Sequence, residues 1–160
     1  MVSTDALFRI ADAAEEAGNY ELARQSFERA ASLGCADCLT RLAYMFDVGI
    51  GVEVDKSHAM QLYKRAWRQG SQVAANNIAI LYRERRQPRL TFQWFLRAAN
   101  AGDGDAFVEL AKCYLTGVGV RKSRQDALRC LASAVSSDCI TDASREEAQA
   151  LLEGMRPRAV

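Results

Sequence analysis

The pair Cys35 and Cys38 is the first feature of the sequence that could do chemistry. A C-x-x-C spacing at a helix start can lower a thiol pKa for redox work or supply half of a zinc site. No second C-x-x-C follows, His58 is the only histidine, and Cys38 aligns with Ala74 and Ala106 in the repeat described below. We therefore favour structural cysteines and keep thiol-based metal binding or redox chemistry through Cys35 and Cys38 as the alternative. An odd total of 5 cysteines without a signal peptide also fits reduced thiols.

Three other features could carry chemistry, and each has a simpler explanation. His58 has no serine or cysteine nucleophile in register, so no catalytic site is expected. The G-x-G segments at Gly49–Val52 and Gly117–Val120 could cradle a phosphate, but no strand precedes them and they recur in register, which indicates a structural turn. The arginines between Arg83 and Arg89 lack interleaved stacking aromatics and are interpreted as solvated charge. We therefore expect no enzyme activity, no cofactor, no metal and no nucleic-acid partner.

The elements that must position these residues follow from the composition. The chain has 160 residues, of which 49% are hydrophobic, 26% are charged, 27 are alanine and only 2 are proline, which favours one domain of packed helices. No apolar run reaches the roughly 18 residues that span a bilayer, and no signal peptide is recognisable, so a soluble cytoplasmic protein without a membrane partner is expected. The net charge is +1, yet residues 1–55 carry −6 and residues 56–100 carry +8. This central basic block leaves a local anionic partner possible.

A repeat organises the whole chain. The segments Arg29–Gly34, Arg65–Gly70 and Arg97–Gly102 are near-copies, a fourth copy ends at Asp138, and the periods are 36, 32 and 36 residues. Aligning these segments gives columns of one residue type, namely Phe27, Tyr63, Phe95 and Leu131; Ala30, Ala66, Ala98 and Ala134; Ala43, Ala79 and Ala111; and Leu42, Ile78 and Leu110. Columns spaced three and four apart are apolar stripes of helices. Each repeat is therefore predicted to form two antiparallel helices, A and then B.

The repeat resembles a known family. An A helix that ends in Tyr or Phe, then G-x-G-V, then a capped B helix and a terminal Ala-Ala-x-x-Gly is similar to the Sel1-like repeats, relatives of the tetratricopeptide repeats, over about residues 35–138. The first repeat looks more like a plain tetratricopeptide repeat, and Thr141 to Met155 is predicted to form a capping helix. The resemblance implies an all-α, right-handed solenoid of four helical hairpins plus this helix. We expect a single domain over residues 1–155 and a flexible tail over residues 156–160.

The same resemblance implies a function in protein recognition. Such solenoids bind a protein or peptide on a concave face built from the A helices, and the tetratricopeptide groove pattern places these side chains there: Asp5, Phe8, Asp12, Glu15, Asp37, Thr40, Tyr44, Asp47, Val73, Asn76, Asn77, Ile80, Arg83, Asp105, Val108, Lys112 and Leu115. From these we choose seven candidates for partner binding: Asp12, Tyr44, Asn76, Asn77, Ile80, Arg83 and Lys112. Asn77 matches an amide that holds a peptide backbone in the family, and the alternative is a polar helix surface without a ligand. The predicted function is an adaptor, a scaffold or an inhibitor- or immunity-type binder, with the partner and the oligomeric state left open.

Overall fold

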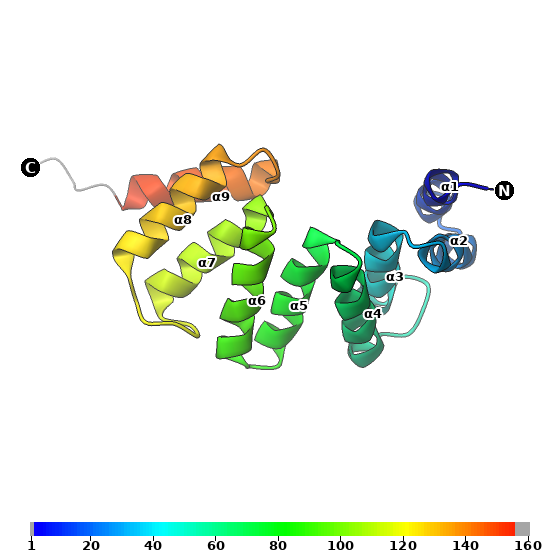
Figure 1. Cartoon of the computed structure of the whole chain (residues 1–160), viewed down its shortest axis with the longest axis horizontal. Coiled ribbons are helices and arrows are strands. Elements are labelled where there is room, and N and C mark those ends of the chain that lie inside the picture. Colours follow the sequence, from blue (N-terminus) through cyan, green and yellow to red (C-terminus); the bar gives the residue numbers. More distant parts are fainter. Residues whose placement is uncertain (1, 156–160) are drawn as a thin grey trace, which may run out of the picture. The chain divides into compact units, whose positions relative to one another are not determined.

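The computed structural model describes residues 2–155, and that part of the chain consists of nine helices joined by short turns (Figure 1). The helices are α1 (Thr4–Glu16), α2 (Tyr20–Ser32), α3 (Ala36–Val48), α4 (Lys56–Arg68), α5 (Gln72–Glu84), α6 (Pro88–Asn100), α7 (Gly104–Thr116), α8 (Arg124–Ser136) and α9 (Asp142–Gly154). The all-α class and the helical hairpins predicted from the repeat are confirmed. None of the described helices has the length and apolar character of a bilayer-spanning helix. The predicted tail, residues 156–160, lies outside the described residues.

The chain divides into two compact units. Unit 1, Met1–Ala74, holds α1 to α4, in which α1 packs against α2, α2 against α3 and α3 against α4. Unit 2, Ala75–Val160, holds most of α5 and all of α6 to α9. In unit 2, α7 packs against α6 and α8, and α9 covers both α7 and α8. We call α1, α3, α5 and α7 the A helices and α2, α4, α6 and α8 the B helices.

Most of the described helices begin where the sequence offers a side-chain acceptor. Asp55 accepts from the backbone N–H groups of Ser57 and His58, and Ser123 accepts from that of Asp126, as predicted for these two caps. Pro88 occupies the first turn of α6, where its missing N–H costs nothing. Thr141 caps α9, so the predicted C-terminal helix is confirmed. Local sequence thus decides the helix starts.

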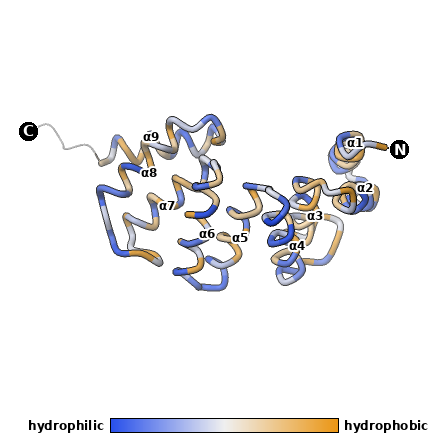
Figure 2. The backbone as a smooth tube through the Cα atoms, in the orientation of Figure 1, coloured by the Kyte–Doolittle hydropathy of each residue, from blue (hydrophilic) through white to orange (hydrophobic). Residues whose placement is uncertain are grey.

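The repeat columns form the core of each unit. The A-helix column has an exposed fraction of 0% at all four positions, Ala11, Ala43, Ala79 and Ala111. The large B-helix column is also at 0%, at Phe27, Tyr63, Phe95 and Leu131. Figure 2 shows hydrophobic and hydrophilic stretches alternating along the helices, as expected when one stripe of each helix is buried. The alanines let helix backbones approach, and the large side chains fill the space between them.

The G-x-G segments are turns that pack against the preceding hairpin. Gly49 and Gly117 end α3 and α7 with φ values of 82° and 81°, in the left-handed region that favours glycine. A Cβ atom on Gly51 would overlap the Tyr20 side chain. A Cβ atom on Gly119 would overlap the Pro88 carbonyl and press on Phe92. The second glycine is therefore needed for close approach, which agrees with the structural interpretation of this motif.

Candidate functional site

The seven candidate residues fall into both units. Asp12 and Tyr44 belong to unit 1, on α1 and α3. Asn76, Asn77, Ile80, Arg83 and Lys112 belong to unit 2, on α5 and α7. All seven are at least partly exposed, whereas the alanine that precedes Asp12, Tyr44, Ile80 and Lys112 is fully buried.

In unit 1, Arg41 joins the two A helices. Its guanidinium is 2.7 Å from the Glu15 carboxylate and 3.8 Å from that of Asp12. The same guanidinium lies 5.9 Å from the centre of the Phe27 ring, at cation–π distance. Arg41 is therefore held in place by α1 and α2 while it lies on α3. Asp12 keeps about half of its side chain exposed, at 50%, so much of its charge stays available to a partner.

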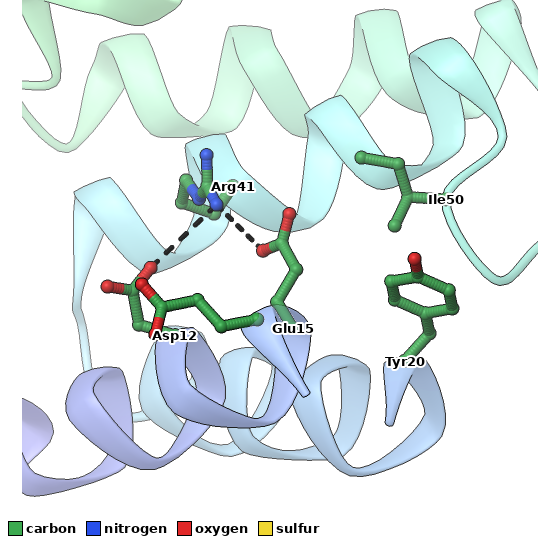
Figure 3. Close-up of a pocket in the computed structure, with 6 residues that line it drawn as sticks. Asp12, Glu15, Tyr20, Arg41 and Ile50 are labelled. Atoms are coloured by element: carbon green, nitrogen blue, oxygen red, sulfur yellow. Dashed lines mark hydrogen bonds and ion pairs between the residues drawn. The ribbon is translucent and has the colours of Figure 1, made fainter. Parts of the chain in front are cut away.

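A pocket of about 340 Å³ opens beside Arg41 (Figure 3). Its walls are Asp12, Glu15, Glu16, Tyr20, Arg41 and Ile50. In Figure 3 the Tyr20 ring and Ile50 lie on one side, and the Arg41 ion pairs with Asp12 and Glu15 lie on the other. The lining has three carboxylates and one guanidinium, so its formal charge is negative. Such a pocket suits a basic or polar side chain better than an acidic one.

Tyr44 is the exposed aromatic residue of this surface. It lies one turn along α3 from Arg41 and is 40% exposed, between buried Ala43 and Met45. Two other positions of the groove pattern in α3 were predicted wrongly. Thr40 is buried and its hydroxyl donates to Ala36 O, at 3.0 Å, and bonds to Ser71 Oγ, at 2.9 Å.

Asp47 is the second wrong position. Its exposed fraction is 7%, Lys56 Nζ lies 2.6 Å from one carboxylate oxygen, and Tyr63 donates from its hydroxyl to the other at 3.2 Å. A carboxylate between a lysine and a tyrosine that belongs to the core column ties the A helix to the B helix of its own hairpin. Asp47 is therefore a structural residue of α3–α4, and a partner cannot reach it.

In unit 2, the amide of Asn76 stands out. Its Oδ1 atom is buried and has no hydrogen-bond partner, and it is the one such side-chain atom found in the described part of the chain. A buried acceptor without a donor costs about 1–3 kcal/mol. Asn77 and Ile80 are half-buried on the same helix. The sequence singled out Asn77, whereas the unsatisfied amide oxygen belongs to its neighbour.

Arg83 and Lys112 are committed to ion pairs. Arg83 Nη1 is 2.6 Å from Glu109, and the Arg83 guanidinium lies 5.7 Å from the Phe95 ring centre. Lys112 Nζ is 2.8 Å from Glu109 and 2.8 Å from Glu147. Burial is the largest single influence and opposes the charged form of Lys112, but the hydrogen bonds and charges of the two glutamates together outweigh it and raise the pKa of the amine. The network links α5, α7 and α9 within unit 2.

One position of the groove pattern in α7, Val108, was predicted wrongly, and a second, Asp105, is half-buried and contacts the start of α9. Val108 is 1% exposed and belongs to the core around Leu131. Asp105 accepts hydrogen bonds from the backbone N–H of Thr141, at 2.9 Å, and from its hydroxyl, at 3.0 Å. These contacts hold the start of α9. The capping helix therefore uses part of the surface that the groove pattern had assigned to a partner.

The cysteines do not support the thiol-based alternative. Cys35 and Cys38 are joined by a disulfide, so the expectation of reduced thiols is wrong for this pair. Burial raises the pKa of the Cys113 thiol to about 11, with the Glu109 carboxylate adding to the shift, and burial also raises the pKa of Cys130. No group of three or more metal-ligating side chains occurs among residues 2–155. Cys130, interpreted as a core residue, is half-buried.

Sequence reasoning missed Arg41 and Glu109, the two residues that hold these surfaces together. Both occupy the repeat position of Asn77, which is one residue past the position of Thr40 and Asn76. Carrying the Asn77 position through every repeat would have found them. It would not have shown the ion pairs that join neighbouring A helices, because Glu15 and Arg83 lie 26 residues away in the sequence from Arg41 and Glu109 respectively.

The comparisons with known proteins agree with this architecture. Residues 5–35, 36–71, 73–103 and 106–139 match the family model described as Sel1 repeat. The chain belongs to the Sel1 repeat family. Proteins with Sel1 repeats generally serve as non-catalytic scaffolds for protein–protein interaction. No match was found among the curated proteins.

Three solved structures share the fold. A Sel1 repeat protein from Oxalobacter formigenes superposes with a TM-score of 0.77 at 19% identity, over 96% of this chain and 74% of the other. The protein c5321, a protective antigen of uropathogenic Escherichia coli strains, gives 0.73 at 19% identity, over 98% of this chain and 43% of its own length. The MamA protein superposes with a TM-score of 0.56 at 15% identity, over 94% of this chain and 88% of the MamA chain. These identities support the Sel1 repeat solenoid as a fold and nothing finer.

Proposed function

We propose that this Sel1 repeat protein is a non-catalytic module that recognises a protein or peptide through the exposed surfaces of its A helices. The role is that of an adaptor or scaffold, with an inhibitor- or immunity-type binder as its more specific form. The binding residues proposed are Asp12 and Tyr44 in unit 1, and Asn76, Asn77, Ile80, Arg83 and Lys112 in unit 2. A cytoplasmic location and the lack of a nucleic-acid partner are parts of the same proposal.

One contrast between neighbouring columns carries the proposal. The column Ala11, Ala43, Ala79 and Ala111 keeps one residue type and is fully buried. The next residue of each A helix, namely Asp12, Tyr44, Ile80 and Lys112, is exposed at least in part and is in turn acidic, aromatic, aliphatic and basic. If these positions only had to face water, polar side chains would suffice, yet Tyr44 is exposed and Ile80 is half-buried there. Varied side chains presented at one position of successive repeats are what selective recognition of one partner requires.

The amide of Asn76 supports the same surface. Rotation of the side chain about χ2 would turn its oxygen outward, where it could accept a hydrogen bond from a peptide N–H, while the amide nitrogen takes the buried place. Arg83 and Lys112 act differently, because their charges are already shared with Glu109 and Glu147. In the proposal these two residues fix the surface and set its charge, while the amides and Tyr44 make the direct contacts.

The test is an affinity capture from native lysate that compares the wild type with two matched triple variants. The surface variant is Tyr44→Ala, Asn76→Ala and Ile80→Ala, which leaves the Arg83 and Lys112 ion pairs in place. The control variant is Gln61→Ala, Leu96→Ala and Leu128→Ala, at exposed positions of B helices. Circular dichroism confirms that all three proteins fold. We expect a protein captured by the wild type and the control, and lost from the surface variant.

Binding of that protein is then measured by isothermal titration with the purified partner. We expect the surface variant to lose about tenfold or more in affinity, which corresponds to about 1.4 kcal/mol, since central aromatic and apolar contacts carry most of a binding energy. Equal affinity in the wild type and the surface variant would remove the A helices as the binding surface. Loss of binding in the control alone would move the site to the B helices.

A further inference from the structure

The ion pair that joins two consecutive A helices occurs in both units, with its charges exchanged. In unit 1, Glu15 on α1 pairs with Arg41 on α3 at 2.7 Å. In unit 2, Arg83 on α5 pairs with Glu109 on α7 at 2.6 Å. Glu15 and Arg83 occupy the same repeat position, Arg41 and Glu109 share another, and 26 residues separate the partners in each pair. The same framework therefore carries opposite charges in the two units.

A pocket opens beside each of these ion pairs. The pocket of unit 1 is the one beside Arg41, with a volume of about 340 Å³ (Figure 3). The pocket of unit 2 has a volume of about 280 Å³ and is lined by Arg83, Arg86, Gln87, Pro88, Thr91 and Val118. Three of its walls match the first pocket in repeat register: Arg83 matches Glu15, Pro88 matches Tyr20, and Val118 matches Ile50. We call the first the acidic pocket and the second the basic pocket.

The G-x-G turns build a wall of both pockets. The middle residue of each G-x-G segment lines a pocket, Ile50 the acidic one and Val118 the basic one. A Cβ atom on Gly51 or Gly119 would overlap the first residue of the B helix in the preceding repeat. The close approach that requires the second glycine thus brings the turn up to that helix start and forms the pocket. Its recurrence in register, in two separate units, indicates a site type that belongs to the repeat.

The acidic pocket has the chemistry of a site for a guanidinium group. Of its three carboxylates, Glu15 pairs closely with Arg41, whereas Glu16 makes no ion pair among the residues that the structure describes. Tyr20 is 41% exposed, and its ring lies on the side of the pocket opposite the Arg41 ion pairs (Figure 3). A planar guanidinium donates to a carboxylate through two parallel hydrogen bonds and stacks on an aromatic ring. An arginine side chain therefore fits this pocket better than a lysine.

The basic pocket has the opposite preference. Its lining holds two arginines and no carboxylate. Glu109, the ion-pair partner of Arg83, lies outside the lining. Arg86 is exposed and makes no ion pair within residues 2–155, so its whole charge is available to a ligand. A carboxylate side chain would be attracted to this pocket, and a guanidinium group would be repelled from it.

We propose that the two pockets are charge-selective side-chain pockets for a protein or peptide partner, the acidic pocket taking an arginine and the basic pocket a glutamate or aspartate. This inference rests on the proposed function and adds the side-chain chemistry of the partner. Asp12 and Arg83, two of the residues proposed for partner binding, each line one of the pockets. Tyr44, Asn76 and Ile80 line neither, so the pockets are tested apart from the surface variant.

The test is a titration of the isotope-labelled full chain, followed by its amide NMR resonances at neutral pH. The probes are N-acetyl-arginine N-methylamide and N-acetyl-glutamate N-methylamide, each added to about 50 mM at matched ionic strength. We expect the arginine probe to shift Tyr20 and Ile50, and the glutamate probe to shift Arg86 and Val118. Dissociation constants of about 1–10 mM suit ligands of this size. Each probe should bind the other pocket at least about tenfold more weakly.

Two single substitutions assign the charges. Glu16→Gln should weaken binding of the arginine probe about fivefold or more and leave the glutamate probe unchanged. Arg86→Gln should do the reverse. Glu53→Gln and Arg85→Gln are the matched controls, because both residues are exposed and lie outside the two linings. Each variant keeps the site of the other probe, and retained binding there shows that the chain is folded.

Two further probes separate the ligand chemistries. The citrulline analogue of the arginine probe keeps its planar shape without the charge, and it should bind the acidic pocket at least about tenfold more weakly. Free arginine should bind no better than the capped probe. Free arginine that binds tenfold more tightly would overturn the assignment to a peptide side chain, because its charged α-amino and α-carboxylate groups would then be part of the recognition.

The remaining outcomes are equally clear. No shift at either pocket up to about 50 mM overturns the proposal. Equal binding of both probes to both pockets overturns it as well, since the exchanged charges would then select nothing. The titration uses no partner protein, so its result does not depend on the lysate capture. Charge-selective binding of the probes together with a failed capture would keep the pockets and remove the contacts proposed for Tyr44, Asn76 and Ile80.

Discussion

Four environments divide the cysteines at the scale of single residues. Cys35 and Cys38 form a disulfide at the start of α3, Cys113 is buried, Cys130 is half-buried and Cys139 is exposed. A thiol reacts as the thiolate, so exposure and pKa decide its rate together. Cys139 is exposed and can therefore be reached by a reagent. Cys113 is buried, and because its pKa is about 11 it also forms little thiolate near neutral pH.

A thiol titration with Ellman's reagent tests this assignment. In the native protein at pH 8 we expect one fast thiol, from Cys139, with Cys130 slower and Cys113 unreactive until the chain unfolds. In denaturant without reductant, the number of thiols should be three, and it should be five after reduction. Five thiols before reduction would contradict the Cys35–Cys38 disulfide. A fast Cys113 would contradict its burial.

Arg86 is strained by its backbone conformation. Its φ is 54°, and it is the one non-glycine residue with a positive φ in the described chain. It stands at the repeat position of Gly18, whose φ is 74°. The A-to-B turn of the third repeat thus uses a left-handed conformation that arginine adopts at a cost of about 1–2 kcal/mol. The four-residue deletion that removes the G-x-G segment leaves this turn without a glycine.

Replacing Arg86 by glycine should stabilise the protein. The left-handed strain is removed, and the greater freedom of glycine in the unfolded chain offsets about 0.5–1 kcal/mol of the gain. We expect Arg86→Gly to raise the free energy of unfolding by about 0.5–1 kcal/mol, measured by urea denaturation followed with circular dichroism. Arg85→Gly is the control, because Arg85 has no positive φ, and it should lower stability. A loss of stability in Arg86→Gly would show that its side-chain contacts outweigh the strain.

At the scale of elements, the glycines of the turns differ in what surrounds them. Gly34 and Gly51 both have positive φ values, 93° and 65°. Outside Gly34 and its two chain neighbours, no heavy atom lies within 4 Å of a Cβ placed there, whereas a Cβ on Gly51 would overlap Tyr20. The pair therefore separates the cost of backbone strain from the cost of crowding between hairpins.

Alanine at both positions measures the two costs. Gly34→Ala should lower the free energy of unfolding by about 1–2 kcal/mol, through left-handed strain alone. Gly51→Ala should lose a further 1–3 kcal/mol or so, because the turn must move away from α2. Chemical denaturation of the two variants gives the difference. Equal losses would mean that Tyr20 yields freely and that the second glycine serves conformation only.

The helices and their caps were predictable because their causes are local. Asp55, Ser123 and Pro88 mark helix starts through their own side chains, and the Ala and Phe columns repeat at helical spacing. The surface was less predictable, because the groove pattern predicts which face of a helix a residue lies on but not which side chains of other helices it contacts. Asp47 was assigned to a partner because nothing nearby in sequence shows that Lys56 and Tyr63 hold it. Asp105 was assigned likewise, 36 residues before Thr141.

At the scale of the whole molecule, stability is distributed over two cores. Unit 1 buries its own columns around Phe27 and Tyr63, and the C-terminal hairpin of unit 2 buries Val108, Ala111 and Leu131 under α9. Each helix contacts mainly its neighbours in sequence, as the pairs α1–α2, α2–α3 and α3–α4 show. In such repeat proteins a destabilising substitution increases the rate of local unfolding around it before it unfolds the whole chain.

Hydrogen exchange on two matched variants tests this distribution. Ala43→Leu and Ala111→Leu enlarge the same fully buried column in units 1 and 2, and each should cost about 1–3 kcal/mol through overpacking. In native buffer followed by mass spectrometry, Ala43→Leu should speed exchange in α1 to α4 and leave α7 to α9 near wild-type rates. Ala111→Leu should do the reverse. Uniform acceleration along the chain in both variants would mean that the two units open together, and that the repeats unfold as one cooperative block despite their separate cores.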